Sequence, residues 1–284
     1  MKIIEWIVNP ASFIFSSIPA VVVLLFAAAL VLSATGFYRL VYFISIGYGF
    51  SIAGMAIISA VVFNYGLTWF SVLHASLLAV YGLRLGLFLL RREFQASYKK
   101  EQEEIQKEYP ARKVVLKLAI WITVSLLYVI MVSPLVFHLE AVCSPVFSTI
   151  TIVGLIAGFA GLGIEAAADF QKSAFKKKYP ARFCDSGLYR VVRSPNYFGE
   201  ILVWLGSFLA AIPFYGNDLW RWIFAATGLA VIILIMLGSA KRLEAKQEER
   251  YGADIAFKEY CRRTPILFPL VPIKSLKKLK VYLG

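Results

Sequence analysis

Seven long apolar stretches dominate this sequence, and each is long enough to cross a membrane as a helix. Of the 284 residues, 60% are hydrophobic, which leaves too few polar residues to cover so large a core in water. A helix needs about 20 predominantly apolar residues to cross the hydrocarbon of a bilayer. The sequence therefore predicts an all-α, polytopic membrane protein with about seven transmembrane helices. The expected spans are residues 12–34, 40–63, 67–89, 114–137, 145–168, 197–214 and 219–239.

The formal net charge of +13 is concentrated in segments that seven spans would place on one side of the membrane. These basic segments are residues 91–113, 172–193 and 241–280, whereas the loops on the opposite side contain no Lys or Arg. Loops rich in Lys and Arg stay in the cytoplasm. We therefore expect the N-terminus outside and the C-terminus in the cytoplasm, in a bacterial inner membrane or the endoplasmic reticulum. Because topology and membrane lipids account for the charge, a nucleic-acid partner is not expected.

Cysteine and histidine usage gives no sign of a metal centre. Cys143, Cys184 and Cys261 have no paired spacing, and His74 and His138 are few and far apart in the sequence. We expect neither a zinc site nor a disulfide framework. The whole chain, residues 1–284, is interpreted as a single integral membrane domain.

The segment Gly187–Glu200 carries the densest set of polar and aromatic residues next to a span. A carboxylate within a membrane is costly, so Glu200 is by default a functional hypothesis. Pro195 suits the first position of a helix, and Ser194 suits its cap. If the helix begins there, Asn196 and Glu200 share one helical face.

Two further polar sets lie on predicted spans. Glu165, Asp169 and Lys172 share a helical face at the end of the fifth span, where they form either a ligand site or a ladder of ion pairs. Tyr81 and Arg84 lie on the third span. Tyr81 is either a proton donor or a core aromatic, and in the second interpretation Arg84 extends to the membrane interface.

Glycines and the C-terminal tail give structural expectations. The residues Gly154, Gly158, Gly161 and Gly163 give the fifth span a small-residue face suited to close helix packing. The tail from Ala240 onward alternates charged and apolar residues, as in an amphipathic helix. Its terminal run of lysines, Lys274–Lys280, is interpreted as solvated or lipid-facing charge.

A dinucleotide would need cations for its phosphates and polar groups for its sugars. The sequence contains no glycine fingerprint of a Rossmann fold, so helix ends and basic loops would have to hold such a ligand. One guanidinium group can donate to two phosphate oxygens at once, which makes Arg182, Arg190 and Arg193 candidate phosphate-binding residues. Asn196 offers both a donor and an acceptor, and Glu200 offers acceptors for a ribose hydroxyl.

The run Arg193-Ser-Pro-Asn-Tyr-Phe-Gly-Glu200 resembles the Arg-His-Pro-Asn-Tyr-Phe-Gly-Glu signature of the steroid 5-alpha-reductase superfamily, with Ser194 in place of the histidine. Tyr81-Gly-Leu-Arg84 resembles the Tyr-x-x-Arg of these reductases. The resemblance is strongest over residues 161–269, which it marks as a cofactor-binding region.

This resemblance implies a membrane-embedded, NADPH-dependent reductase. Such an enzyme reduces a C=C bond conjugated to a carbonyl in a lipid-soluble substrate of steroid or isoprenoid type. Tyr81 would be the catalytic residue that polarises the carbonyl or donates a proton. The residues expected to bind NADPH are Glu165, Asp169, Lys172, Arg182, Arg193, Asn196, Tyr197 and Glu200.

Two alternatives remain open. The second span, residues 40–63, lacks the Gln-Glu pair that binds the ketone in steroid-reducing members, and Ser45 and Tyr48 are its polar candidates. That departure favours a non-catalytic, lipid-binding protein. The second alternative is an enzyme like the isoprenylcysteine carboxyl methyltransferases, which use S-adenosylmethionine, because the pair Glu248-Glu249 resembles paired acids of these enzymes.

Overall fold

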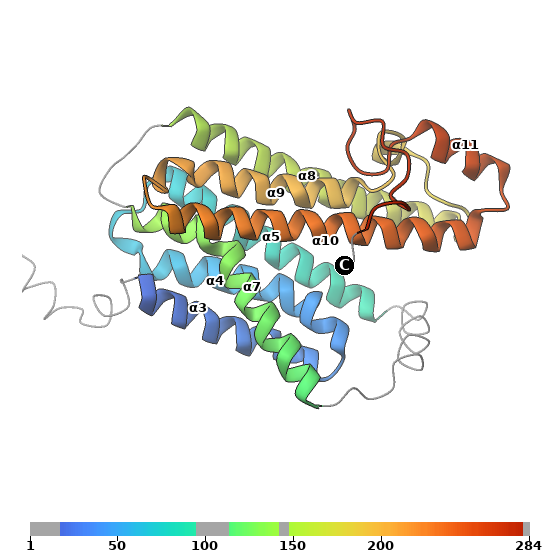
Figure 1. Cartoon of the computed structure of the whole chain (residues 1–284). Coiled ribbons are helices and arrows are strands. Elements are labelled where there is room, and N and C mark those ends of the chain that lie inside the picture. Colours follow the sequence, from blue (N-terminus) through green and yellow to red (C-terminus); the bar gives the residue numbers. More distant parts are fainter. Residues whose placement is uncertain (1–17, 95–113, 142–147, 281–284) are drawn as a thin grey trace, which may run out of the picture. The chain divides into compact units, whose positions relative to one another are not determined.

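A computed structural model describes residues 18–94, 114–141 and 148–280 of the chain (Figure 1). Residues 12–17 of the first predicted span, residues 95–113 of the first basic loop and Cys143 lie outside these ranges. The described residues form helices and connecting segments without a strand. The elements are α3 (Ile18–Ser33), η1 (Ala34–Phe37), η2 (Leu40–Ile44), α4 (Ile46–Val62), η3 (Asn64–Gly66), α5 (Trp69–Glu93), α7 (Val114–Glu140), α8 (Thr149–Lys178), η4 (Gly187–Arg190), α9 (Pro195–Ala211), η5 (Ile212–Phe214), α10 (Leu219–Tyr251) and α11 (Ile255–Arg263).

Seven of the described helical segments are long and apolar enough to cross a membrane, which confirms the predicted all-α, multi-pass architecture. They are Ile18–Phe37, Leu40–Val62, Trp69–Glu93, Val114–Glu140, Thr149–Lys178, Pro195–Phe214 and Leu219–Tyr251. The orientation of the termini stays a prediction.

Several helices run well past the apolar stretches that predicted them. The 30 residues of α8 and the 33 residues of α10 correspond to about 45 and about 50 Å of helix. The hydrocarbon core of a bilayer is only about 30 Å thick. The charged last turns of both helices therefore project beyond the hydrocarbon.

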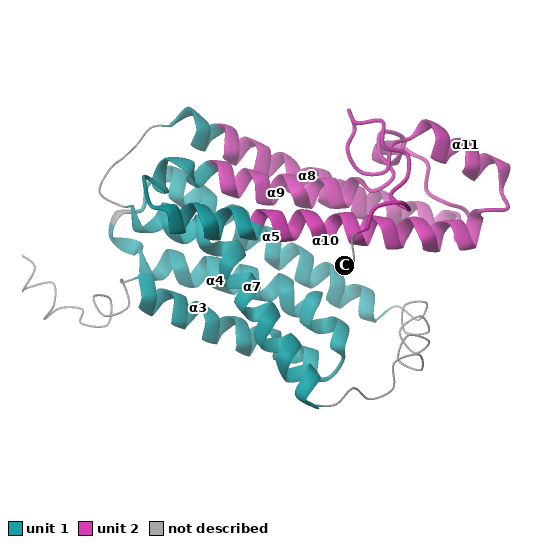
Figure 2. Ribbon diagram, in the orientation of Figure 1, with its two compact units in different colours: residues 1–152, 210–228 teal, residues 153–209, 229–284 magenta. Residues whose placement is uncertain are grey.

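The chain divides into two compact units, which Figure 2 shows in teal and magenta. Unit 1 comprises residues 1–152 and 210–228, and unit 2 comprises residues 153–209 and 229–284. The division falls within α8, α9 and α10, so each of these helices contributes residues to both units.

In unit 1, α4 and α5 pack with their backbones in contact. A Cβ atom added to Gly49 would lie 2.6 Å from the amide nitrogen of Gly86, and one added to Gly82 would lie 2.6 Å from that of Ala53. Such distances leave room for hydrogen only. The side chains beside these glycines, Tyr48 and Tyr81, are buried.

In unit 2, α8 and α9 are held together by another set of glycines. A Cβ atom on Gly161 would lie 2.5 Å from the carbonyl oxygen of Gly199, and one on Gly206 would lie 2.5 Å from that of Gly154 and 2.6 Å from the Cα of Gly158. These contacts confirm the predicted small-residue face of the fifth span at three positions. The fourth, Gly163, has open space beside it.

Candidate functional site

Two buried glutamates, Glu165 on α8 and Glu200 on α9, lie where these two helices are in close contact. A Cβ atom on Gly199 would lie 2.7 Å from the amide nitrogen of Glu165, so Glu165 lies beside the turn of α9 that carries Glu200. Both glutamates are buried. The sequence placed both residues in one candidate site, and the glycine contact is the physical reason that they can approach.

The loop before α9 is fastened to α8 through a tight turn. Gly187 has a φ of 59°, a left-handed conformation that glycine adopts without strain. The side-chain oxygen of Gln171 accepts a hydrogen bond from the amide of Leu188 at 2.9 Å. This anchor fixes the start of the Gly187–Glu200 segment against α8.

Tyr189 is the third residue of that segment and is buried. Its hydroxyl points to the carbonyl oxygen of Ala168 at 3.4 Å, and its own carbonyl accepts a hydrogen bond of 2.7 Å from the hydroxyl of Tyr260. Burial, reinforced by the nearby carboxylate of Asp169, raises the pKa of Tyr189 well above its usual value. At neutral pH Tyr189 is therefore a protonated, neutral hydroxyl.

A cavity of about 120 Å³ lies at the charged ends of α8 and α10. It is lined by four cationic side chains and no acidic one, an arrangement that favours an anionic ligand. Lys172 belongs to the predicted site, whereas Lys176, Lys246 and Arg250 were missed. The signal for them was the spacing of four residues within each basic pair, which places both members on one helical face. The remaining lining residues are Phe183, Cys184, Tyr189, Gln247 and Tyr251.

One of the cavity cations is held in place by its neighbours. The ammonium group of Lys176 donates to the hydroxyl of Tyr251 at 2.6 Å and to the carbonyl oxygen of Arg182 at 2.5 Å. Arg182 itself is exposed, pairs with Asp185 at 2.8 Å and is not among the lining residues. The predicted role of Arg182 in phosphate binding stays a prediction; its observed contribution is the carbonyl that positions Lys176.

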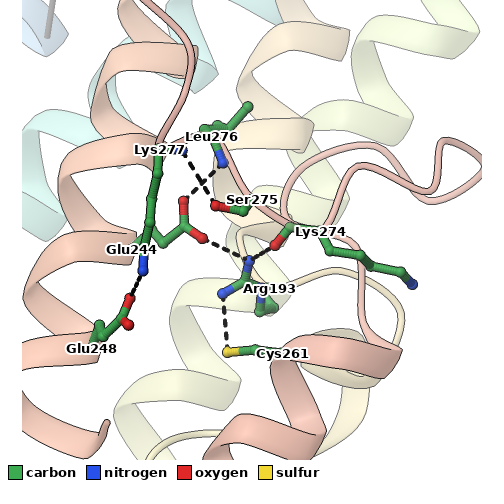
Figure 3. A network of polar contacts seen from close by, with 8 residues as sticks. All are labelled: Arg193, Glu244, Glu248, Cys261, Lys274, Ser275, Leu276 and Lys277. Carbon is green, nitrogen blue, oxygen red and sulfur yellow. Dashed lines mark hydrogen bonds and ion pairs between the residues drawn. The ribbon is translucent and has the colours of Figure 1, made fainter.

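Arg193 lies at the centre of a buried polar network, shown in Figure 3. Its guanidinium donates to the carboxylate of Glu244 at 3.4 Å, to the thiol sulfur of Cys261 at 3.1 Å and to the carbonyl oxygen of Lys274. Its backbone amide donates to the carbonyl oxygen of Pro265 at 2.9 Å. Arg193 thus joins the segment before α9 to α10, α11 and the C-terminal residues.

The second oxygen of Glu244 accepts a hydrogen bond of 2.9 Å from the amide of Leu276. Glu244 therefore binds Arg193 and the C-terminal residues at once. Burial raises the pKa of the Cys261 thiol despite the adjacent guanidinium, so the sulfur meets Arg193 as a neutral acceptor. In this arrangement the side chain of Arg193 is used for structure, and its predicted phosphate role stays a prediction.

The remaining predicted cofactor residues, Asn196 and Tyr197, are half-buried in the first turn of α9. That helix begins at Pro195, as the sequence predicts. Asn196 and Glu200 accordingly lie one turn apart on the same helix.

Tyr81, the predicted catalytic residue, lies in unit 1 and is fully buried. Its hydroxyl oxygen is 2.9 Å from that of Tyr48 on α4. The ring of Tyr48 also lies 5.3 Å from the ring of Tyr128, whose hydroxyl donates to the carbonyl oxygen of Phe43 at 2.6 Å. The structure thus gives Tyr81 a hydroxyl partner on the second span, which lacks acids and amides.

The two histidines, which are far apart in the sequence, come together in unit 1. The Nδ1 atoms of His74 and His138 lie 3.0 Å apart, and the ring of His138 stacks on Phe214 at 4.2 Å. These side chains are 64 positions apart in the sequence and meet because α5 and α7 are in contact. No group of three or more His, Cys, Asp or Glu side chains that could hold a metal ion occurs within residues 18–94, 114–141 and 148–280.

Residues 12–264 match the sequence profile of a family described as "Protein of unknown function (DUF1295)". The chain belongs to this family. The DUF1295 match includes Tyr81, all the predicted cofactor residues and Glu244, and it ends before Lys274 and Leu276. Neither a curated protein nor a solved structure gives a significant match to the chain.

Proposed function

We propose that this DUF1295 protein is a membrane-embedded, NADPH-dependent reductase of the steroid 5-alpha-reductase type, acting on a C=C bond conjugated to a carbonyl in a lipid-soluble substrate. The observation that carries the proposal is the basic cavity of unit 2, which is lined by Lys172 of the candidate set and by Tyr189 of the segment before α9. The charged side chains of its lining are all cationic and lie on helix turns beyond the hydrocarbon, which suits a water-soluble, polyanionic cofactor better than it suits a lipid.

The residues present fit the charged part of NADPH. Lys172, Lys176, Lys246 and Arg250 supply the positive charge that its phosphates require. The aromatic side chains of Phe183 and Tyr251 provide flat apolar walls. When bound, the cofactor would supply a hydride to the carbon of the double bond that lies β to the carbonyl.

The polar residues of α8 and α9 are proposed to orient the sugar and amide groups of the cofactor. Glu165 and Glu200 offer carboxyl oxygens in a buried setting, Asp169 offers another, and Asn196 offers both a donor and an acceptor. The protonated hydroxyl of Tyr189 lies in the same region. Buried polar groups of this kind fix the orientation of a ligand because each lost hydrogen bond is costly.

Tyr81 is proposed to stabilise the negative charge that develops on the substrate carbonyl oxygen and to supply the proton that completes the reduction. A hydroxyl in a dry site suits both roles. Tyr48 would then serve in place of the acid and amide groups that the second span lacks.

The proposal is tested by thermal unfolding of the purified protein with NADPH, NADH and S-adenosylmethionine. A ligand at about one hundred times its Kd should stabilise the folded state by about 2.7 kcal/mol. We expect NADPH to stabilise most, because NADH lacks one phosphate. Lys176→Gln/Arg250→Gln and Asn196→Ala/Glu200→Ala should each abolish the shift. The matched control, Lys258→Gln/Arg262→Gln, removes two exposed charges from α11 and should retain it.

Stabilisation by S-adenosylmethionine alone would move the protein to the methyltransferases. The absence of a shift with any of the three ligands would leave a non-catalytic, lipid-binding protein. A shift with NADPH that persists in both double variants would place the cofactor elsewhere in the molecule.

A further inference from the structure

The last described residues form a basic and apolar segment that the proposed function does not use. Residues 270–280, here named the C-terminal strap, read Leu-Val-Pro-Ile-Lys-Ser-Leu-Lys-Lys-Leu-Lys and contain four lysines and no acid. Every side chain of the strap except that of Leu276 is exposed. Leu270 is 96% exposed, and Val271, Ile273 and Leu279 also present apolar surface.

Polar contacts fix the level of the strap along α10. The amide of Leu276 donates to Glu244 at 2.9 Å, and the ammonium group of Lys241 donates to the carbonyl oxygen of Leu279 at 2.7 Å. Lys277 forms an ion pair with Glu248. Residues 276–279 of the strap therefore lie along the turns of α10 that run from Lys241 to Glu248.

These turns come directly after the apolar part of α10. The stretch Leu219–Ala240 is about 33 Å long as a helix, which matches the hydrocarbon thickness of about 30 Å. Lys241 is the first charged residue beyond it. The strap is consequently held at the level of the lipid headgroups.

Apolar side chains at this level gain free energy by entering the boundary between headgroups and acyl chains. Each lysine near an anionic surface favours association by about fivefold. Within the described residues, no hydrogen bond or ion pair of the side chains of Lys278 and Lys280 is seen, so both charges can face the lipid. Glu244 and Glu248 tie the strap to α10 through Leu276 and Lys277.

We propose that the C-terminal strap is a binding site for the surface of an anionic phospholipid membrane. Leu276 and the two glutamates hold the strap on the protein, Leu270 and its apolar neighbours enter the headgroup boundary, and Lys278 and Lys280 bind anionic headgroups. This inference is independent of the proposed reductase, because it involves neither the cavity nor the polar residues of α8 and α9.

The test places a fluorescent amino acid at position 270 of the full chain, reconstituted in nanodiscs whose lipids carry bromine near the top of the acyl chains. Bromine quenches only fluorophores that it closely approaches. We expect strong quenching with about 30% phosphatidylglycerol and at least twofold weaker quenching with phosphatidylcholine alone. Lys278→Gln/Lys280→Gln should reduce the quenching in the anionic nanodiscs to the phosphatidylcholine level.

The matched control is again Lys258→Gln/Arg262→Gln, which removes two exposed positive charges outside the strap and should leave the quenching unchanged. No quenching in any nanodisc would overturn the proposal. Equal quenching in both lipids, or equal loss in both double variants, would overturn the specific binding of anionic headgroups by the strap. Thermal unfolding of each variant checks that it remains folded.

Discussion

The hydroxyl oxygen of Tyr48 lies 2.9 Å from that of Tyr81, and each tyrosine directly precedes a glycine through which α4 and α5 touch. The two Tyr-Gly pairs act together. Gly49 and Gly82 bring the backbones into contact, and this contact brings the hydroxyls within hydrogen-bonding distance. A larger residue at either glycine would separate the helices and break the pair.

We expect the hydroxyls of Tyr48 and Tyr81 to be energetically coupled. Tyr48→Phe and Tyr81→Phe each remove the shared hydrogen bond, so the double variant should lose less stability than the sum of the single variants. Hydrogen bonds between membrane helices contribute about 0.6 to about 1.7 kcal/mol, and the coupling energy should lie in this range. A double-mutant cycle measured by reversible unfolding in detergent tests it.

The control for this cycle is Tyr128→Phe, which removes the separate hydrogen bond to Phe43. When Tyr128→Phe is combined with Tyr81→Phe, the losses of unfolding free energy should be additive. Coupling of Tyr81 to Tyr128 as strong as that to Tyr48 would contradict the pairing.

Gly199→Ala should destabilise unit 2. Its added Cβ would lie 2.7 Å from both the amide of Glu165 and the carbonyl oxygen of Gly161. These are backbone atoms that cannot rotate away, so we expect a loss of about 1 to about 3 kcal/mol. Gly163→Ala on α8 is the matched control, because nothing lies within 4 Å of its added Cβ. That substitution should be neutral or slightly stabilising. Similar unfolding midpoints for the two variants would refute the close helix contact.

Removing the carboxylate of Glu244 should release the C-terminal residues. Glu244→Ala leaves the buried guanidinium of Arg193 without its carboxylate partner, a change that costs about 3 to about 5 kcal/mol in buried pairs. The amide of Leu276 also loses its acceptor. We expect a lower unfolding midpoint and faster tryptic cleavage after Lys277 and Lys278. Glu249→Ala, at an exposed position on the same helix, should change neither measurement. If Glu244→Ala resists trypsin as well as the unmodified protein does, the network does not hold the C-terminal residues.

Stability should fall at alkaline pH. Burial raises the pKa of Tyr189 and of Tyr260 above the usual value of 10.0. The folded state therefore binds these protons more tightly than the unfolded chain does. This stabilisation is complete below pH 10.0 and is lost as the pH rises through the folded pKa.

The measurement is the free energy of unfolding between about pH 8 and about pH 11.5. Tyr189→Phe should reduce the slope above the usual pKa by up to about 1.4 kcal/mol per pH unit. Tyr179→Phe, at an exposed tyrosine, is the matched control. An unchanged slope in Tyr189→Phe would contradict the role of its burial.

Hydrophobicity along the chain was sufficient to predict the helical spans. In the hydrocarbon of a bilayer every backbone N–H and C=O must be hydrogen-bonded within the protein, and a helix satisfies this requirement within one segment. The start of α9 at Pro195 and most of the glycine face of α8 were also predictable from the sequence, because they depend on the shape of single residues. Helix ends were less predictable. Charged turns such as Lys172–Lys178 leave the hydrocarbon without ending the helix.

Tertiary structure decided which distant side chains meet. Spacing along one helix predicts that Glu165, Asp169 and Lys172 share a face. It cannot show that Lys246 and Arg250 of another helix line the same cavity as Lys172. It also assigned Arg193 to a ligand, whereas the fold surrounds that guanidinium with Glu244, Cys261 and Lys274.

The pairing of His74 with His138 was likewise outside the reach of the sequence. The physical reason is the same in each case. Membrane insertion depends on the composition of one segment at a time, whereas a side-chain contact depends on the packing of several helices. The sequence by itself determined that this chain crosses a membrane as helices, and only the packing of those helices decided which charges and hydroxyls face one another.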